Sequence, residues 1–176
     1  SYLAGQFLIA MPALSDPNFN RTVTFVCEHS DHGALGIIVN RPSNLLLGEI
    51  LDQLALMPVS PAVHQEAIYT GGPVQQDRGF VLHDGTAEWD TTMTVSGGVR
   101  VTTSRDILAA IAAGDGPANR LIALGYAGEH QDGLHPAAYS ADDIGVHTVA
   151  NHGGLFRMRA QVVERGAHHQ RIGLAD

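Results

Sequence analysis

Residues 21–40 constrain the fold of this chain more than any other stretch of the sequence. Apolar residues occupy every second position from Val23 to Cys27 within Arg21–Glu28, which is the period-two pattern of a β-strand. Ala34–Asn40 is a short apolar run typical of a buried strand, and the link His29–Gly33 supplies the serine, aspartate and glycine that favour a turn. The sequence therefore predicts an antiparallel hairpin here.

The remainder of the chain adds two helices and further short strands. Leucines at helical spacing predict an amphipathic helix over Asn44–Leu56 with Ser43 as its N-cap, and a second helix opens at Thr103 and ends at Gly114. Because helices and strands do not alternate regularly, we expect a single α+β domain over residues 1–176 with a mixed, mostly antiparallel sheet. The other predicted strands are Ala67–Thr70, Gly79–His83, Thr91–Val95, Val99–Thr102, Leu121–Gly125 and a half-exposed one over 156–162.

The charge of the chain limits its partners. Its 10 basic residues are all arginines, and 18 acidic residues give a net charge of −8 with histidine neutral. A chain this acidic has no general attraction for nucleic acid, so direct nucleic-acid binding is not expected. The apolar run Phe7–Leu14 is shorter than the roughly 18 residues that a membrane helix needs, and no basic segment precedes it. We therefore expect a cytoplasmic protein without a membrane segment.

Cys27, Glu28, His29 and His32 bring a thiol, a carboxylate and two imidazoles close together in sequence. Their spacing matches no zinc pattern, and a single cysteine excludes an internal disulfide, so neither a metal nor a cofactor is predicted. Cys27 and His29 would share one face of a strand, which would suit a nucleophile and its base. No third group that would orient them is evident, and burial of Cys27 as a small apolar residue is the favoured interpretation.

Two further features are suited to anions. Gly71 and Gly72 follow a predicted strand and could direct backbone N–H groups at an anion, although a tight turn before Pro73 is the simpler interpretation. Arg78 offers a planar fork for a carboxylate or phosphate, but a surface ion pair with an acidic residue is the favoured interpretation.

Thr103 and Asp106 form a capping-box pattern, which predicts that the Thr103 hydroxyl accepts a hydrogen bond from the Asp106 amide. The negative charge of Asp106 would also complement the helix dipole. This interpretation gives both residues a structural role without any catalysis.

Several polar residues lie at predicted strand ends or in adjoining turns, where scaffolds usually place functional groups. With Arg78 as a cation and His83 as a titratable group, a small anionic ligand or an acidic segment of a protein partner would be the natural complement. One shared site requires at least three of the five side chains to meet on a concave surface. The predicted ligand-binding residues are Glu28, His29, Asn40, Arg78 and His83, with Gly71 and Gly72 adding backbone N–H groups.

Seven segments carry a family resemblance, in order along the chain from Phe7 to Gly128: FLIAMP (7–12), CEH (27–29), GALGIIVNRP (33–42), GGPV (71–74), DRGFVLH (77–83), TTSRD (102–106) and ALGY (123–126). Together they closely resemble the bacterial YqgE/AlgH family. The resemblance implies a single α+β domain with a bifurcated, partly barrel-like sheet and flanking helices. Members of the family are mostly uncharacterised and some are described as transcriptional regulators, so it implies no catalytic residues and no cofactor.

The sequence departs from the family pattern after Gly128, and Arg171–Leu174 resembles the family again. Two explanations remain for residues 129–165: a segment translated in a shifted reading frame, or a divergent tail. Under either explanation, the histidines of this segment are poor evidence for function.

Three functions remain compatible with the sequence. We rank first a non-catalytic regulatory module that binds a ligand or a protein partner. A regulator that binds DNA directly is the second, although the predicted helix Asn44–Leu56 carries Glu49 and Asp52 and no basic residue. The third is a hydrolase that uses Cys27 and His29, which would require both groups in one pocket with perturbed pKa values.

Overall fold

The computed structural model of the chain describes residues 3–130 and 146–149. The helices are α1 (Leu47–Gln53), α2 (Pro61–His64), α3 (Arg105–Ala113) and a short 3₁₀ turn, Ser96–Gly98. The strands are β1 (Phe7–Ala10), β2 (Val23–Ser30), β3 (Gly33–Ile38), β4 (Pro42–Leu46), β5 (Ala67–Thr70), β6 (Val74–His83), β7 (Thr92–Thr94), β8 (Arg100–Thr102), β9 (Arg120–His130) and β10 (Val146–Val149).

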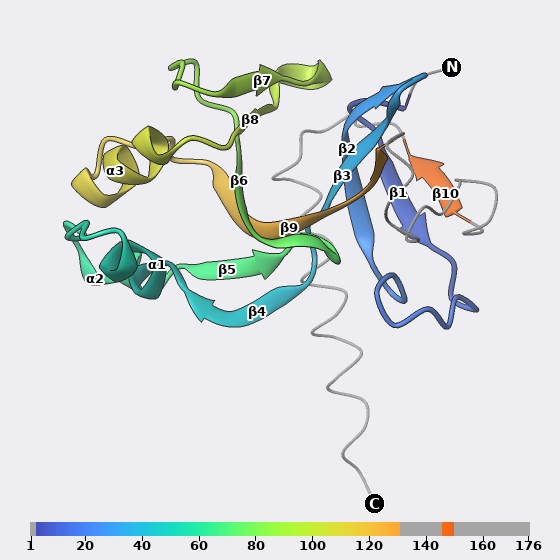
Figure 1. Cartoon of the computed structure of the whole chain (residues 1–176), viewed down its shortest axis with the longest axis horizontal. Helices are drawn as coiled ribbons and strands as arrows, with labels where there is room; N and C mark the ends of the chain where they lie inside the picture. The colour runs from blue at the N-terminus through green and yellow to red at the C-terminus, as the bar shows by residue number, and fades with distance from the viewer. Residues whose placement is uncertain (1–2, 131–145, 150–176) are drawn as a thin grey trace, which may run out of the picture.

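The sheet forks along its longest strand, β9. Its main path runs β10-β1-β2-β3-β9-β6-β8-β7, and every pairing on this path is antiparallel. One edge of β9 pairs with β6. The other edge is shared by two strands: β3 pairs with residues 127–130, and the parallel strand β5 pairs with Ala123 and Leu124. Strand β4 extends this second branch. Figure 1 shows β9 crossing between the two halves of the molecule, which confirms the α+β class and the bifurcated sheet.

Alternation along β6 and β9 creates two cores. Phe80, Leu82 and Leu121 lie in one core, which also contains Phe7 and Phe25 from the N-terminal strands. The intervening residues of the two strands contribute to the second core, which is covered by α1 and α3 and contains Leu47, Leu51, Ile68, Val81, Ile107, Ile111 and Ile122. Side chains on successive strand residues point to opposite faces, so a continuous apolar run supplies both cores.

The glycine pair marks a crossing of two backbones. After β5, Gly71 donates from its N–H to the Leu124 carbonyl and accepts from the Ile38 N–H, both at 2.8 Å. A Cβ on Gly71 would lie 2.3 Å from the Gly125 oxygen, and one on Gly72 only 2.1 Å from the Tyr126 carbonyl carbon. The two backbones lie too close together for a side chain at Gly71 or Gly72, because the chain crosses β9 here on its way from β5 to β6. The Gly71 amide is therefore already used within the sheet.

The predicted hairpin is confirmed, and β5 has the predicted bounds. The expected helix over Asn44–Leu56 is wrong at both ends. Residues 42–46 are held extended by pairing between Pro42 and Tyr69 and between Leu46 and Ala67, and the helix ends at Gln53 rather than Leu56. Ser43 is not an N-cap, since its hydroxyl donates to the Ile68 carbonyl at 2.7 Å. The helix begins after Leu46, whose N–H donates to Glu49 Oε2 at 2.8 Å.

The second helix ends as predicted at Gly114, which adopts a left-handed conformation at φ 88°. Its start lies one residue later than expected, so Thr103 is not the cap. Ser104 occupies that position, while the Thr103 N–H donates to the Thr91 carbonyl at 3.1 Å. The strand expected over 156–162 lies outside the described residues. None of the helices in the described part of the chain is long and apolar enough to span a membrane.

Candidate functional site

Cys27 is a buried part of the hairpin. It is the extra residue of a β-bulge, since Val26 pairs with Gly36 and Glu28 with Leu35. Burial raises the pKa of the thiol strongly, and the negative charge of Glu28 raises it further. The sulfur contacts the Phe25 carbonyl oxygen at 3.7 Å. A neutral, buried thiol is a poor nucleophile, so this environment argues against the predicted alternative of a Cys27 hydrolase.

Two other predicted ligand-binding residues hold the N-terminal strands. His29 is half-buried, and its Nδ1 accepts a hydrogen bond from the Leu3 N–H at 3.1 Å. The Asn40 amide clamps the start of β2, because its oxygen accepts from the Val23 N–H at 2.8 Å and its nitrogen donates to the Arg21 carbonyl at 2.9 Å. Arg21 itself is left-handed at φ 58°. Asn40 therefore stabilises a strained entry into the strand. Glu28 is exposed on β2.

His83, at the end of β6, belongs to a buried chain of hydrogen bonds. Its side chain is fully buried, and Nε2 lies 2.9 Å from the Thr102 hydroxyl, which lies 2.9 Å from the Thr92 hydroxyl. Thr92 donates to the Trp89 carbonyl at 3.3 Å and accepts from the Trp89 N–H at 3.1 Å. A hydroxyl has one proton to donate, so Thr102 donates to Thr92, and His83 Nε2 is the protonated nitrogen.

This chain of hydrogen bonds links the end of β6 to the loop between β6 and β7, and burial of His83 favours its uncharged form. Burial lowers the pKa of His83 and the positive charge of Arg100 lowers it further, while Asp84 and the Gly85 backbone act in the opposite direction. A buried, neutral imidazole within such a chain of hydrogen bonds has a structural role. His83 is not placed to meet an external ligand.

Ser104 and Asp106 fasten the same loop to the start of α3. The Ser104 hydroxyl donates to Asp106 at 2.5 Å and accepts from the Thr91 N–H at 3.0 Å. The Asp106 carboxylate also accepts from the N–H groups of Asp90 and Ile107, at 2.8 and 3.0 Å. Desolvation raises the pKa of Asp106, but these hydrogen bonds outweigh it and hold the pKa below its ordinary value.

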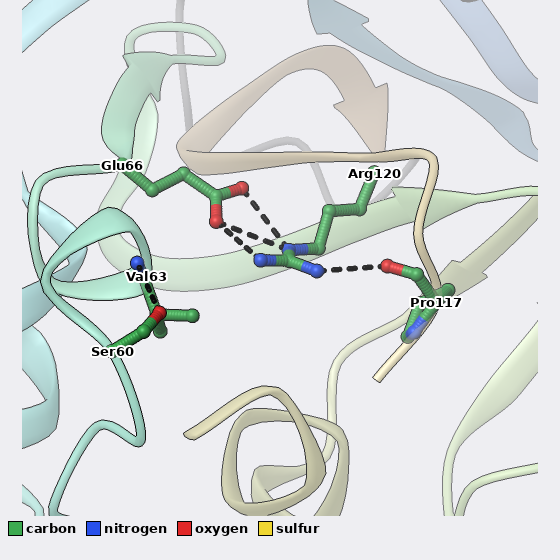
Figure 2. Close-up of polar contacts among 5 residues, drawn as sticks. All are labelled: Ser60, Val63, Glu66, Pro117 and Arg120. Atoms are coloured by element: carbon green, nitrogen blue, oxygen red, sulfur yellow. Dashed lines mark hydrogen bonds and ion pairs between the residues drawn. The ribbon is translucent and has the colours of Figure 1, made fainter. Parts of the chain in front are cut away.

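Most arginines of the described region hold loops in place. Three donate to backbone carbonyls: Arg41 to Asn18, Arg100 to Thr86 and Arg105 to Leu54. Arg120 makes a forked ion pair with Glu66, with a shortest N–O distance of 2.6 Å, and donates to the Pro117 carbonyl at 2.9 Å. Figure 2 shows this pair beside the short helix that Ser60 caps. The planar guanidinium suits such multiple contacts better than an ammonium group would.

Arg78 is different from these four arginines. It is exposed, its guanidinium lies 5.4 Å from the centre of the Phe80 ring, and Nη1 makes a long hydrogen bond of 3.5 Å to Gln75 Oε1. Phe80 is 1% exposed and contacts Tyr126 edge-on, with 5.8 Å between ring centres. Among the side chains of residues 3–128, no carboxylate lies within ion-pairing distance of Arg78. The favoured ion pair is therefore absent from this part of the chain, and stacking on Phe80 orients the guanidinium instead.

Arg78 stands in a wide bulge of β6. Val74 pairs with Tyr126 and Gly79 with Leu124, so four residues of β6 stand opposite the single residue Gly125 of β9 between these two pairs. Residues 75–79 are all exposed, and Gln75 is left-handed at φ 43°. The polar run QQDR before an apolar strand is the sequence signal for this bulge, and of its four residues only Arg78 was a predicted ligand-binding residue.

The predicted five-residue site does not come together. Strand β9 separates its members, because Ala34, the partner of His29, lies opposite Glu129, whereas His83 lies opposite Arg120. Nine residues of strand span about 30 Å. Asn40 and His83 have internal partners, and the Gly71 amide is bonded to β9. Of the predicted set, Arg78 alone combines exposure with a fixed orientation toward solvent in the described region.

Comparisons with known proteins agree with the fold. A family model described as AlgH-like matches residues 7–136. A UPF0301 protein from Xanthomonas axonopodis pv. citri (strain 306) is 52% identical over 126 residues, which cover 72% of this chain and 67% of that protein. A UPF0301 protein from Xanthomonas oryzae pv. oryzae (strain PXO99A) has the same identity over the same length. The family match ends close to the point where the sequence departs from the family pattern.

Two solved structures are similar. The solution structure of the AlgH protein from Pseudomonas aeruginosa aligns with a TM-score of 0.72 and 42% identity, covering 99% of this chain and 91% of that one. The crystal structure of a protein from Corynebacterium diphtheriae aligns with a TM-score of 0.61, covering 85% of this chain and 76% of that one. At 16% identity, the second similarity concerns the fold alone.

Proposed function

The chain belongs to the AlgH-like family, and we propose that it is a non-catalytic regulatory module that recognises a carboxylate of its partner through Arg78. The observation that carries the proposal is the state of this side chain. Arg78 is exposed and unpaired within the described residues, yet oriented by the Phe80 ring and by Gln75. A pre-oriented guanidinium loses little conformational freedom when it forms a bidentate pair with a carboxylate.

The surroundings of the other reactive groups support a binding role over catalysis. The Cys27 thiol is buried and its pKa is raised, and the His83 imidazole is buried with Nε2 hydrogen-bonded to Thr102. Ser104 and Asp106 are engaged in hydrogen bonds with each other and with backbone N–H groups at the start of α3 and in the preceding loop. These four groups therefore have structural explanations, whereas the exposed guanidinium of Arg78 has no carboxylate partner among the residues whose side chains are described.

The placement of the arginines and acidic residues also favours regulation through a partner over direct contact with DNA. Phosphate recognition requires clustered, accessible cations. Arg41, Arg100, Arg105 and Arg120 instead donate to internal groups, and the exposed side of α1 carries Glu49 and Asp52. We therefore assign the regulatory role to the recognition of a protein or small anionic ligand.

The proposal is tested by titrating the full chain with succinate and, separately, with inorganic phosphate while recording the arginine side-chain N–H signals by NMR. Succinate is expected to shift the Arg78 Nε–H signal most. Arg78→Gln should abolish the response, and Arg21→Gln, at another exposed arginine, should leave it unchanged. Cys27→Ala should also leave it unchanged. An unmoved Arg78 signal, or a response that survives Arg78→Gln, would refute the proposal.

A further inference from the structure

The loop between α1 and α2 exposes two apolar side chains that the fold leaves unburied. Met57 is 87% exposed and Val59 is 63% exposed, whereas the other exposed large hydrophobic side chains of the described region lie between 36% and 39%. The surrounding run, residues 54–63, contains no charged residue. Single exposed apolar side chains are common on protein surfaces, but neighbouring ones that form a patch are typical of an interaction site.

The backbone of this loop is fixed by hydrogen bonds to two helices. The Leu56 N–H donates to the Leu51 carbonyl in α1 at 2.9 Å, and the Val59 N–H donates to the Ala112 carbonyl in the last turn of α3 at 2.7 Å. A fixed loop loses little conformational freedom when a partner binds to it. Met57 and Val59 are therefore held in place for contact with another molecule.

Val59 extends the apolar surface onto the end of α3. A Cβ on Gly114 would lie 3.2 Å from Val59 Cγ1, so the valine side chain lies against the glycine that ends this helix. Ala113, which precedes that glycine, is exposed. Figure 1 shows α1, α2 and α3 together at one end of the molecule. Met57, Val59 and Ala113 therefore make up one apolar surface, the Met57 surface.

Acidic residues flank the Met57 surface. Asp115 follows the end of α3, and Asp52 lies in the last turn of α1; both are exposed, and neither makes an ion pair with a described side chain. Residues 42–77 and 106–119 contain no lysine or arginine. Arg105, the first residue of α3, donates to a backbone carbonyl of the loop. An apolar surface with this negative surround favours a positively charged partner.

We propose that the Met57 surface docks a protein segment whose apolar side chains are flanked by lysine or arginine. Apolar anchors supply most of the affinity of such a contact, and methionine adapts its shape to the partner. The acidic residues on either side orient the segment. A second copy of the chain is a poor partner, because two copies would bring acidic residues against each other.

This inference goes beyond the recognition of a carboxylate by Arg78. The Arg78 guanidinium stacks on Phe80, which belongs to the first core, whereas α1 and α3 cover the second core. The two proposals therefore concern different surfaces and partners of opposite charge. Replacement of both Met57 and Val59 by serine should leave the binding of succinate unchanged, so failure of one proposal is distinguishable from failure of the other.

The test is a selection of random phage-displayed peptides on the full chain, followed by methyl NMR with each selected peptide. We expect the basic, apolar peptides among them to shift the Met57 and Val59 methyl signals and to leave that of Met11, another exposed methionine, in place. Met57→Ser combined with Val59→Ser should weaken these peptides about tenfold. Met11→Ser is the matched control and should bind normally. A selection in which no peptide shifts the Met57 signal would overturn the proposal.

The charge of the partner is tested with a second pair of variants. Asp52→Asn combined with Asp115→Asn should weaken the basic peptides about threefold, because two exposed ion pairs are lost. Glu88→Gln, at an exposed acidic residue of the loop between β6 and β7, should leave the affinity unchanged. Equal binding of acidic peptides at the Met57 surface would overturn a basic partner. Self-association in sedimentation that Met57→Ser abolishes would overturn it in favour of a second copy.

Discussion

The two halves of β6 contrast in how they use similar side chains. At the carboxyl end, residues 81–83 pair with β8 on one edge and β9 on the other, and His83 is fully buried. At the amino end, residues 75–78 project in a bulge, and Arg78 is exposed over the Phe80 ring. Both residues have cationic or titratable side chains at the ends of a predicted strand. The difference indicates that pairing on both edges makes such a side chain part of the structure, whereas the side chain in the unpaired bulge stays exposed.

The largest expected effect comes from the crossing that delivers the chain into β6. Gly72→Ala would place a Cβ 2.1 Å from the Tyr126 carbonyl carbon, in a backbone conformation of φ +155°. We expect a loss of about 4 kcal/mol or more in the free energy of unfolding, measured by urea denaturation. Gly79→Ala is the matched control in the same strand, because its nearest heavy atom would be 4.0 Å away. It should change stability by less than about 1 kcal/mol. Equal effects of the two variants would contradict the crossing.

A smaller loss is expected when the buried chain at the carboxyl end of β6 is interrupted. Thr102→Val keeps the shape of the side chain but removes the hydroxyl that links His83 to Thr92. The free energy of unfolding should fall by about 1–3 kcal/mol, since buried polar groups lose their partners. Denaturation by urea measures this. A neutral result would mean that the polar chain does not stabilise the loop between β6 and β7.

Titration of His83 should add a pH dependence to the stability. Its pKa is lowered in the folded state, so the unfolded chain takes up the proton first as the pH falls below about 6.5. The stabilisation from the neutral ring is complete above that value and is lost toward the folded pKa, by at most about 1.4 kcal/mol per pH unit. Urea denaturation of the wild type and His83→Gln between pH 7.5 and 5.5 measures the difference. The variant should lose less stability on acidification, and parallel curves would contradict this.

The smallest effect on stability is expected at the exposed end of β6. Arg78→Gln removes a contact with a ring that stays buried, and surface changes of this kind usually alter stability by less than about 0.5 kcal/mol. The same variant is expected to abolish carboxylate binding. Urea denaturation measures the change in stability, and the NMR titration measures the loss of carboxylate binding. A destabilisation as large as that of Thr102→Val would mean that Arg78 is a structural residue, which would remove the contrast between the two ends.

Local sequence signals predicted the elements whose formation depends on neighbouring residues. The alternation of residues 23–27, the bounds of β5 and the glycine that ends α3 were all evident from the sequence. The wrong caps at Ser43 and Thr103 have a common cause. In each case, a polar group of the expected cap is bonded to a residue of another strand or loop. The Ser43 hydroxyl donates to the Ile68 carbonyl, and the Thr103 N–H donates to the Thr91 carbonyl.

The candidate site was predictable only in part for the same reason. Side-chain chemistry identified Arg78 as a fork for an anion. It could not show that Asn40 would bond to Val23 and Arg21, or that His83 would bond to Thr102, because these partners are fixed by the assembled sheet. The exposure of Arg78 follows from the bulge in which β6 leaves β9 between Val74 and Gly79, which no local pattern encodes.

Residue-resolved amide hydrogen exchange of the full chain tests the contrast within β6 most directly. The account predicts slow exchange for residues 81–83, which are paired on both edges, and fast exchange for most amides of residues 75–78 in the bulge. Uniformly slow exchange along the whole of β6 would contradict this contrast, because residues 75–78 would then be paired like residues 81–83.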